Sequence, residues 1–175
     1  MFALRNSLLG GVSAFALGCT MVGAGNATAA AAHNAPLAAN AATYMIVNAH
    51  SRKCLEIENS SKRNGARAQQ WTCNGQAGSK WHLKSVSRVD VYFVNAHSGK
   101  CLEIENSSKR DGARAQQWAC NGQAGSKWRV GKSDTGDLYI INARSGKCLE
   151  IENSSKRNGA RAQQWTCNGQ AGSKW

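Results

Sequence analysis

Proline and acidic residues are scarce in this sequence. A single proline occurs in 175 residues, and with 18 glycines the composition is not that of a collagen-like chain. Six tryptophans argue against a disordered chain and favour a packed fold. Ten Asp and Glu residues stand against 22 Lys and Arg residues, which gives a formal net charge of +12. This charge favours anionic partners, namely nucleic acid, an anionic surface or an acidic polysaccharide, and does not choose among them.

No long, uninterrupted apolar run is present, so we expect no membrane span. Residues 8–21 are apolar and small, but glycines and polar residues interrupt them. One positive charge, Arg5, precedes this stretch, and Ala27-Thr28-Ala29 matches the small-residue cleavage pattern of a secretory signal peptide. We therefore predict a signal peptide at residues 1–30, an alanine-rich linker at 31–43 and a secreted, extracellular protein.

Closely spaced metal ligands are also lacking. The sequence contains neither a C-x-x-C nor an H-x-x-x-H motif, so we predict no zinc or other metal site, and no cofactor. Seven cysteines are an odd number for an exported protein, but removal of the leader together with Cys19 would leave an even set. An even set in an exported chain is typical of disulfides. Lipidation of Cys19 is an alternative that the sequence leaves open.

Three copies of one unit make up most of the chain. Cysteines recur at intervals of 47 residues, and the segment 54–81 returns unchanged at 148–175. At 101–128 it returns with two differences, Asp111 and Ala119. Each copy holds two cysteines that are 19 residues apart, so among the many conceivable pairings we predict the one that respects the repeat. The predicted disulfides are Cys54–Cys73, Cys101–Cys120 and Cys148–Cys167.

Each repeat has the pattern of several short strands. In the first repeat we expect strands at residues 44–47, 54–57, 68–73 and 80–83, and the Asn64-Gly65 dipeptide predicts a tight turn. No segment shows a sustained helical period. Four short strands in each of three repeats predict an all-β, closed architecture.

The number of repeats selects among closed all-β folds. Propellers normally have at least four blades, and the rungs of a β-solenoid are usually shorter than 47 residues. We therefore predict a β-trefoil domain at residues 44–175, made of three near-identical repeats with pseudo-threefold symmetry at about 44–90, 91–137 and 138–175. The third repeat stops at Trp175 without most of its closing strand. We expect either some fraying there or cover by residues just before Tyr44.

Three motifs of the repeat now carry a family resemblance. C-L-E-I, A-Q-Q-W-T-C-N-G and S-K-W, with Q-x-W occurring three times, resemble the ricin B-type lectin module. The likeness extends over residues 44–175. It implies a β-trefoil with up to three sugar pockets, one per repeat, and hence a secreted carbohydrate-binding protein whose partners are glycans or polysaccharides. We expect it to act as a monomer.

The resemblance also implies which residues form each sugar pocket. An acidic residue accepts hydrogen bonds from sugar hydroxyls, a tryptophan forms a stacking platform, and a glutamine two residues before the platform is a polar partner. An indole face and a charged acceptor suit the C–H groups and hydroxyls of a sugar ring. The carbohydrate-binding residues implied in this way are Glu56, Gln69 and Trp71, then Glu103, Gln116 and Trp118, and finally Glu150, Gln163 and Trp165.

The repeats depart from the family pattern at two places. The usual pocket acid is Asp, whereas this chain has the longer Glu. The family commonly has Asn-Gln where this chain has Gly78-Ser79 and its two copies, so an Asn that donates to a sugar hydroxyl is missing, and Asn74 is a candidate to replace it. Two alternatives stay open: Trp71 either stacks on sugar or packs inside, and Glu56 either accepts hydrogen bonds from sugar or pairs with a nearby Lys or Arg. Core positions are expected for Trp81, Trp128 and Trp175.

Other functions remain as alternatives to a lectin. The cluster Lys62, Arg63 and Arg67, repeated three times, suits electrostatic binding of anionic cell-wall polymers. A protein-interaction or inhibitor trefoil would need one long, unique loop, which the repeats lack. We predict no enzyme, because no nucleophile–base set is present and the pair Glu56 and Glu58 has no second domain to form a cleft. Nucleic acid is not expected as a physiological ligand of a secreted, disulfide-bonded chain.

Overall fold

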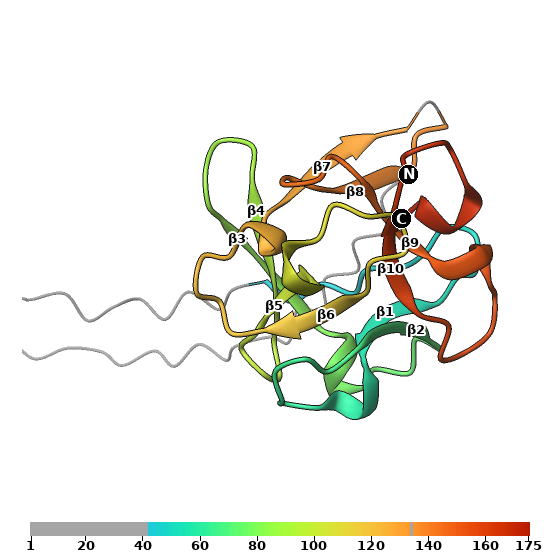
Figure 1. The fold of residues 1–175 in the computed structure, drawn as a ribbon. Helices are drawn as coiled ribbons and strands as arrows, with labels where there is room; N and C mark the ends of the chain where they lie inside the picture. Colours follow the sequence, from blue (N-terminus) through green and yellow to red (C-terminus); the bar gives the residue numbers. More distant parts are fainter. Residues whose placement is uncertain (1–41, 134) are drawn as a thin grey trace, which may run out of the picture. The chain divides into compact units, whose positions relative to one another are not determined.

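A computed structural model describes residues 42–133 and 135–175 (Figure 1). The predicted signal peptide, Cys19 and all but the last two residues of the predicted linker lie outside these ranges. The strands are β1 (Cys54–Ile57), β2 (Ala68–Trp71), β3 (Trp81–Ser85), β4 (Val91–Asn95), β5 (Cys101–Ile104), β6 (Ala115–Trp118), β7 (Trp128–Lys132), β8 (Leu138–Asn142), β9 (Cys148–Ile151) and β10 (Ala162–Trp165). Between them lie short 3-10 turns, η1 (Glu58–Ser60), η2 (Ala77–Ser79), η3 (Glu105–Ser107), η4 (Ala124–Ser126), η5 (Glu152–Ser154) and η6 (Ala171–Ser173). The all-β prediction is confirmed.

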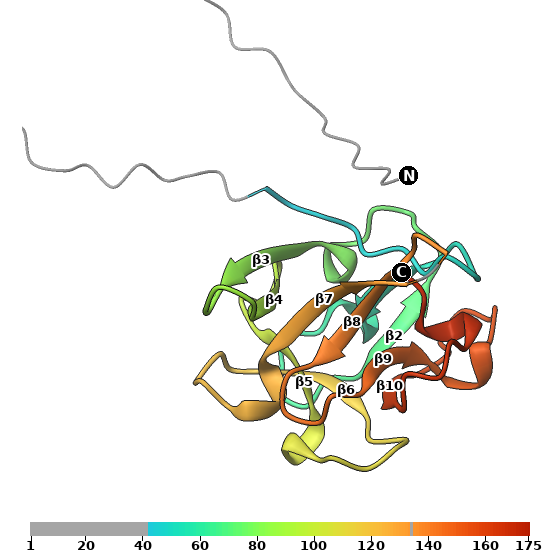
Figure 2. The same ribbon diagram turned by 90° about the horizontal axis from the view of Figure 1, so that it is seen from above.

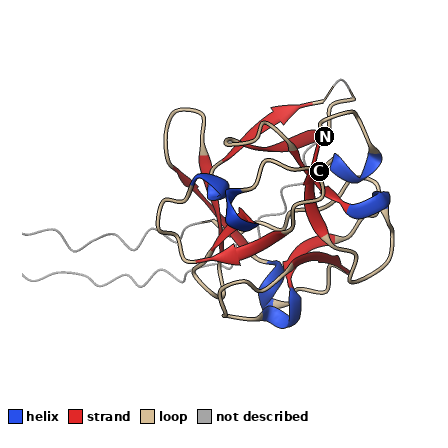
Figure 3. Ribbon diagram, viewed as in Figure 1, coloured by secondary structure: helices blue, strands red, loops and turns tan. Residues whose placement is uncertain are grey.

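The strands form hairpins that repeat three times around a common centre (Figures 1 and 2). Strands β1 and β2, β5 and β6, and β9 and β10 pair antiparallel in one shared register. Strand β3 pairs with β4 and β7 pairs with β8, so each of these hairpins joins one repeat to the next. The 3-10 turns gather in three places, one for each repeat (Figure 3). This is the predicted β-trefoil with pseudo-threefold symmetry. No helix in the described residues is long and apolar enough to cross a membrane.

The core is built from the same positions of each repeat. All four residues of β1 are buried, because one face of the strand lies against the core and the other against the rest of its own repeat. Trp81 and Trp128 are completely buried, as expected, and the indole N–H of Trp81 donates to the carbonyl oxygen of Leu55 at 3.0 Å. Trp175 is only partly buried, although it packs against the core and makes the equivalent bond to Leu149.

Buried asparagine side chains link successive repeats. Asn95 donates from Nδ2 to the carbonyl oxygen of Gly78 at 2.8 Å, and Asn142 does the same to Gly125. Asn48 completes the circle, since its Nδ2 donates to the carbonyl oxygen of Gly172 at 2.9 Å. One buried amide per junction therefore satisfies a turn carbonyl that water no longer reaches.

Residues that follow Tyr44 help to close the third repeat. Trp175 and Leu138 exchange two backbone hydrogen bonds of 2.9 Å, and the N–H of Ala49 donates to the carbonyl oxygen of Lys174. Tyr44 instead pairs with Trp81 of its own repeat. The buried amide of Asn48 and its neighbouring backbone thus join the first repeat to the third. Of the residues just before Tyr44, which we expected as one possible cover, the structure describes only Ala42 and Thr43.

Three disulfides each join the two cysteines of one repeat. The bonds are Cys54–Cys73, Cys101–Cys120 and Cys148–Cys167, each with Cα atoms 5.1 Å apart. The first cysteine of each pair is completely buried in a strand, whereas the second is exposed beyond the end of the next strand. Each bond therefore ties the open end of a hairpin to the loop that follows it.

Gly125 and its copies occupy positions where a side chain does not fit. A Cβ atom on Gly125 would lie 2.7 Å from the carbonyl oxygen of Ile104 and 2.9 Å from the Cα atom of Ser107. The N–H of Gly125 donates to the hydroxyl of Ser107 at 2.9 Å, which holds the two turns together. The asparagine that the family commonly has at this position would therefore not fit between these two turns.

We predict that Gly125→Ala lowers the free energy of unfolding by about 1–3 kcal/mol, the usual range for overpacking, because backbone atoms must move to admit the methyl group. Denaturant unfolding of the oxidised protein measures this loss. The matched control is Gly131→Ala, whose Cβ atom would meet only the terminal carbon of Ile141 at 3.3 Å. Equal losses in the two variants would contradict the steric explanation.

Candidate functional site

Each hairpin brings an acid, an amide and a tryptophan to the same place. In the first repeat Glu56 lies opposite Gln69, and Cys54 lies opposite Trp71. Because side chains alternate along a strand, Gln69 and Trp71 emerge on one face of β2. The side-chain N–H of Gln69 donates to Glu56 Oε1 at 2.9 Å, and the equivalent distances are 3.0 Å and 2.9 Å in the other repeats.

A neighbouring arginine orients the glutamine. Arg67 donates from Nη2 to Glu58 Oε1 at 2.9 Å and to Gln69 Oε1 at 3.3 Å. The oxygen of the Gln69 amide therefore faces Arg67, and its nitrogen faces Glu56. The structure also distinguishes the two carboxylates, because Glu58 forms the ion pair with arginine and Glu56 forms none among the described residues.

The acid of the first repeat, Glu56, is buried, and only one of its two carboxylate oxygens accepts a hydrogen bond among the described residues. Glu56 is 2% exposed, and its Oε2 atom has no hydrogen-bond partner among the described residues, which is also true of Glu150. Burial raises the pKa of the Glu56 carboxyl, the hydrogen bond from Gln69 opposes this, and the charge of Glu58 adds to the increase. A buried carboxylate oxygen without a donor is unfavourable by itself. A hydroxyl group that reached Oε2 would relieve this.

A pocket of about 280 Å³ surrounds the acid of the second repeat. Its lining comprises the three residues implied by the family resemblance and three others, namely Glu103, Gln116 and Trp118 with Asn106, Ser107 and Gln123. The 3-10 turn η3 places Asn106, three residues after the acid, at the pocket wall with a left-handed φ of 55°. The sequence carries a signal for this residue, because E-N-S follows the C-L-E-I motif in every repeat.

The tryptophan is half-buried, and a neighbouring repeat covers part of it. A side-chain carbon on Gly65, in the turn of the first repeat, would lie 3.8 Å from Cζ3 of Trp118. In the same way Gly112 lies against Trp165 of the third repeat, and Gly159 against Trp71 of the first. The tryptophan of each site is therefore flanked by a turn of another repeat, whereas the residues that line the pocket of the second repeat all belong to that repeat. The pattern within a single repeat does not predict this contact.

Asn74 and its copies are directed elsewhere. The side-chain oxygen of Asn74 accepts from the backbone N–H of Gln76 at 3.4 Å, and Asn168 makes the same local bond at 3.3 Å. The equivalent Asn121 is not part of the pocket lining, whereas Gln123 is. The amides that line the pocket of the second repeat are therefore Asn106, Gln116 and Gln123.

The exposed cations lie on the turn that precedes each site. Lys62 and Arg63 are exposed, whereas Arg67 is held by its ion pair with Glu58. A shallow hollow of about 360 Å³ lies beside this turn and includes Arg63 and Glu58 in its lining. No group of three potential metal ligands occurs within residues 42–133 and 135–175.

Comparison with known proteins agrees with the geometry. The chain matches the family described as "Ricin-type beta-trefoil lectin domain-like" over residues 33–118 and 124–175. None of the curated proteins matches the chain significantly.

Among solved structures, the chain is similar to a designed threefold-symmetric protein, ThreeFoil, with 33% identity and a TM-score of 0.74, over 76% of this chain and 95% of ThreeFoil. It is also similar to 1,3Gal43A, an exo-beta-1,3-galactanase from Clostridium thermocellum, with 31% identity and a TM-score of 0.73, over 76% of this chain but only 29% of that enzyme. The Rhizoctonia solani agglutinin shares the fold at 19% identity, with a TM-score of 0.70, over 81% of this chain and 96% of the agglutinin. The chain belongs to the ricin-type beta-trefoil lectin domain-like family.

Proposed function

We propose that the protein binds carbohydrate at three sites, one in each repeat, and catalyses no reaction. The observation that carries this proposal is the buried acid of each site, which lies beside a half-buried tryptophan. In Glu56 and Glu150 one carboxylate oxygen has no hydrogen-bond donor among the described residues. A sugar ring meets both needs, since a hydroxyl donates to the carboxylate while C–H groups pack on the indole.

The proposed site residues are those that the family resemblance implies, with two additions. Glu103 accepts from a hydroxyl, Gln116 orients it, and Trp118 provides the apolar contact. Asn106 and Gln123, which line the same pocket, supply further amide donors in place of the asparagine that the family commonly uses. The additions in the other repeats are Asn59, Gln76, Asn153 and Gln170.

The wider setting fits a secreted lectin. We propose that residues 1–30 are removed as a signal peptide and that the domain acts outside the cell as a monomer without a cofactor. Three weak sites on one rigid domain would gain avidity on a polymer or a cell surface. Glycans that contain galactose are suitable first ligands, because 1,3Gal43A, which is 31% identical, is an exo-beta-1,3-galactanase.

A second candidate function is electrostatic binding of anionic polymers through the exposed turns. It is favoured by Lys62 and Arg63, which are exposed, and by a net charge of +12. Salt separates the two functions, because attraction between exposed charges is screened at physiological ionic strength whereas stacking on tryptophan is not.

We predict that the triple variant Trp71→Ala, Trp118→Ala and Trp165→Ala loses binding on a glycan array. Each lost aromatic contact is worth about 0.5–1.5 kcal/mol, so affinity per site should fall roughly two- to tenfold, and avidity should multiply the loss. The matched control is the triple variant Lys62→Ala, Lys109→Ala and Lys156→Ala, which should retain binding at physiological salt. The opposite result, with binding lost only in the lysine variant, would favour the electrostatic candidate.

We also predict that Glu56→Gln, Glu103→Gln and Glu150→Gln together raise the melting temperature at neutral pH while abolishing glycan binding. The pKa of each acid is raised above its ordinary value of 4.5 in the folded protein, so folding favours the protonated form. The unaltered protein therefore loses stability as the pH rises from about 4.5 through the raised pKa, and the glutamine variant escapes this loss.

Calorimetry from about pH 3 to about pH 8 measures the difference in melting temperature between the variant and the unaltered protein. This range begins below the ordinary pKa of a glutamate carboxyl and extends well above it. The advantage of the variant should appear above the ordinary pKa and vanish below it. Glu58→Gln, Glu105→Gln and Glu152→Gln serve as the control, because those acids are ion-paired and should give no gain. A glutamine variant that is less stable at neutral pH would show that the buried acids are structural.

A further inference from the structure

One strand of the trefoil has an edge without a partner among the described residues. In the second and third repeats the first strand is β4 or β8, and it forms a hairpin with β3 or β7. In the first repeat the equivalent residues, 44–48, form only isolated bridges, from Tyr44 to Trp81 and from Val47 to Cys54. No strand of the described chain therefore lies beside them in the way that β3 lies beside β4.

The backbone along this edge is largely unpaired. The N–H of Ala49 donates to the carbonyl oxygen of Lys174 at 2.9 Å, as the equivalent N–H does where β3 and β4 begin to pair. Antiparallel strands exchange hydrogen bonds at every second residue, so the next bonds of such a ladder would fall at Val47 and Met45. In the part of the chain that the structure describes, the N–H and C=O groups of these two residues form no hydrogen bond.

The side chains along the same edge are more exposed than their equivalents. Met45 is 50% exposed and Val47 is 37% exposed, whereas the matching residues of β4 and β8 are half-buried. Ile46, which faces the core, is only partly buried, although its equivalents Phe93 and Ile140 are almost completely buried. An edge that combines unpaired backbone groups with exposed apolar side chains is suited to the addition of a strand.

An aspartate next to this edge indicates a charge preference. Arg129 is the second residue of β7, and its Nε atom lies 2.8 Å from Oδ1 of Asp90, which directly precedes β4 in the same repeat. The equivalent residue of the third repeat is Asp137, which directly precedes β8 and forms no salt bridge within the described residues. A strand added at the third place would therefore bring a basic residue at its second position to Asp137.

The position after the basic residue is aliphatic in both existing strands. Leu83 of β3 lies opposite Phe93, and Val130 of β7 lies opposite Ile140. Residues directly opposite each other in a sheet point to the same face, so Leu83 and Val130 face the core side. In an added strand the equivalent residue would lie opposite Ile46 and cover it.

We propose that the edge of residues 44–48 binds an extended peptide segment of another protein, which adds to the trefoil as an antiparallel strand. The segment carries a basic residue followed by an aliphatic residue, which meet Asp137 and Ile46. Hydrogen bonds to Met45 and Val47 hold its backbone, and the two side chains give the preference. A second copy of this strand does not fit the role, because residues 44–48 contain no basic residue.

The test uses the oxidised protein at physiological salt and the peptide Arg-Val-Gly-Lys-Ser, which copies residues 129–133 and is blocked at both ends. Backbone amide NMR signals and amide hydrogen exchange report on the edge. We expect the amide signals of Met45 and Val47 to shift as the peptide is added, and their exchange to slow, because both N–H groups gain acceptors. The indole signal of the buried Trp81 should not respond.

Two N-methylated peptides separate strand addition from loose contact. The glycine of the peptide takes the place of Gly131, which lies opposite Tyr139, the equivalent of Met45. Its N–H would donate to the C=O group of Met45, so N-methylation of the glycine should abolish binding. The N–H of the peptide valine points away from this edge, because the bonded residues alternate, so N-methylation there should leave binding in place.

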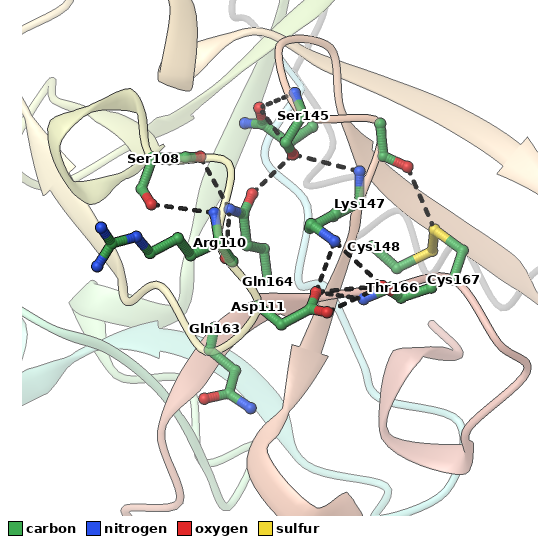
Figure 4. Close-up of polar contacts among 12 residues, drawn as sticks. Ser108, Arg110, Asp111, Ser145, Lys147, Cys148, Gln163, Gln164, Thr166 and Cys167 are labelled. Atoms are coloured by element: carbon green, nitrogen blue, oxygen red, sulfur yellow. Dashed lines mark hydrogen bonds and ion pairs between the residues drawn. A yellow bond between two sulfur atoms is a disulfide. The ribbon is translucent and has the colours of Figure 1, made fainter.

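The charge preference is tested by a cycle of two changes. Glutamine in place of arginine in the peptide should weaken binding to the unaltered protein about two- to fivefold, the usual worth of a partly exposed ion pair. The same change should have no effect on binding to Asp137→Asn. The matched control is Asp111→Asn, which loses one carboxylate from a cluster with Lys147 and Thr166 (Figure 4) and should keep the preference for arginine.

Several results would overturn the inference. Amide signals of Met45 and Val47 that ignore the peptide, or equal binding of the parent and the N-methylglycine peptide, would exclude strand addition. Slow amide exchange at both residues before any peptide is added would show that a second copy or another part of the chain already covers the edge. Glycan binding enters none of these measurements, so the proposed lectin function stands or fails separately.

Discussion

A completely buried glutamine amide in each repeat holds the trefoil together. Gln70 donates from Nε2 to the carbonyl oxygens of Ser155 and Arg157, at 2.7 Å and 2.9 Å, and accepts from the hydroxyl of Ser51 at 2.6 Å. The amide thus satisfies two carbonyl groups in the turn of another repeat. An amide buried without these partners would be strongly unfavourable, so the turn and the strand must come together as the protein folds. The bonds from Gln70 to this turn also place Gly159 against Trp71.

Fold and site use opposite faces of the same short strands. In β2 the side chain of Ala68 lies in the core, whereas Gln69 faces Glu56 and Trp71 borders the pocket. The core face packs against other apolar side chains, while on the outer face one buried oxygen of Glu56 has no hydrogen-bond donor in the part of the chain that the structure describes. Such an incomplete network reduces stability where ligand is absent and favours a ligand that completes it. The buried acid of the site is therefore less well satisfied than the polar groups of the core.

The sequence predicted the fold well because the repeat carried most of the information. Identical spacing of Cys54 and Cys73 in each copy indicated the disulfides, and four short strands per copy indicated the trefoil. Asn106 was missed because the 3-10 turn, rather than strand periodicity, brings it to the acid. The contact between Gly65 and Trp118 was missed because it joins two repeats, and no pattern within one repeat encodes it. The closure at Asn48 was missed for the same reason, since that contact spans the first and third repeats.

A turn of each repeat lies against the tryptophan of the next repeat, and this circular arrangement bears on how a threefold protein arises. The first repeat gives its turn to the second, the second to the third and the third back to the first, as Gly65, Gly112 and Gly159 show. A single repeat therefore leaves its tryptophan without this neighbouring turn, and in a pair of repeats only one tryptophan has it. Three chains of one repeat each would have to assemble as a ring before every tryptophan had its covering turn. Fusion of three gene copies would then preserve these contacts and leave each copy free to acquire a difference such as Asp111.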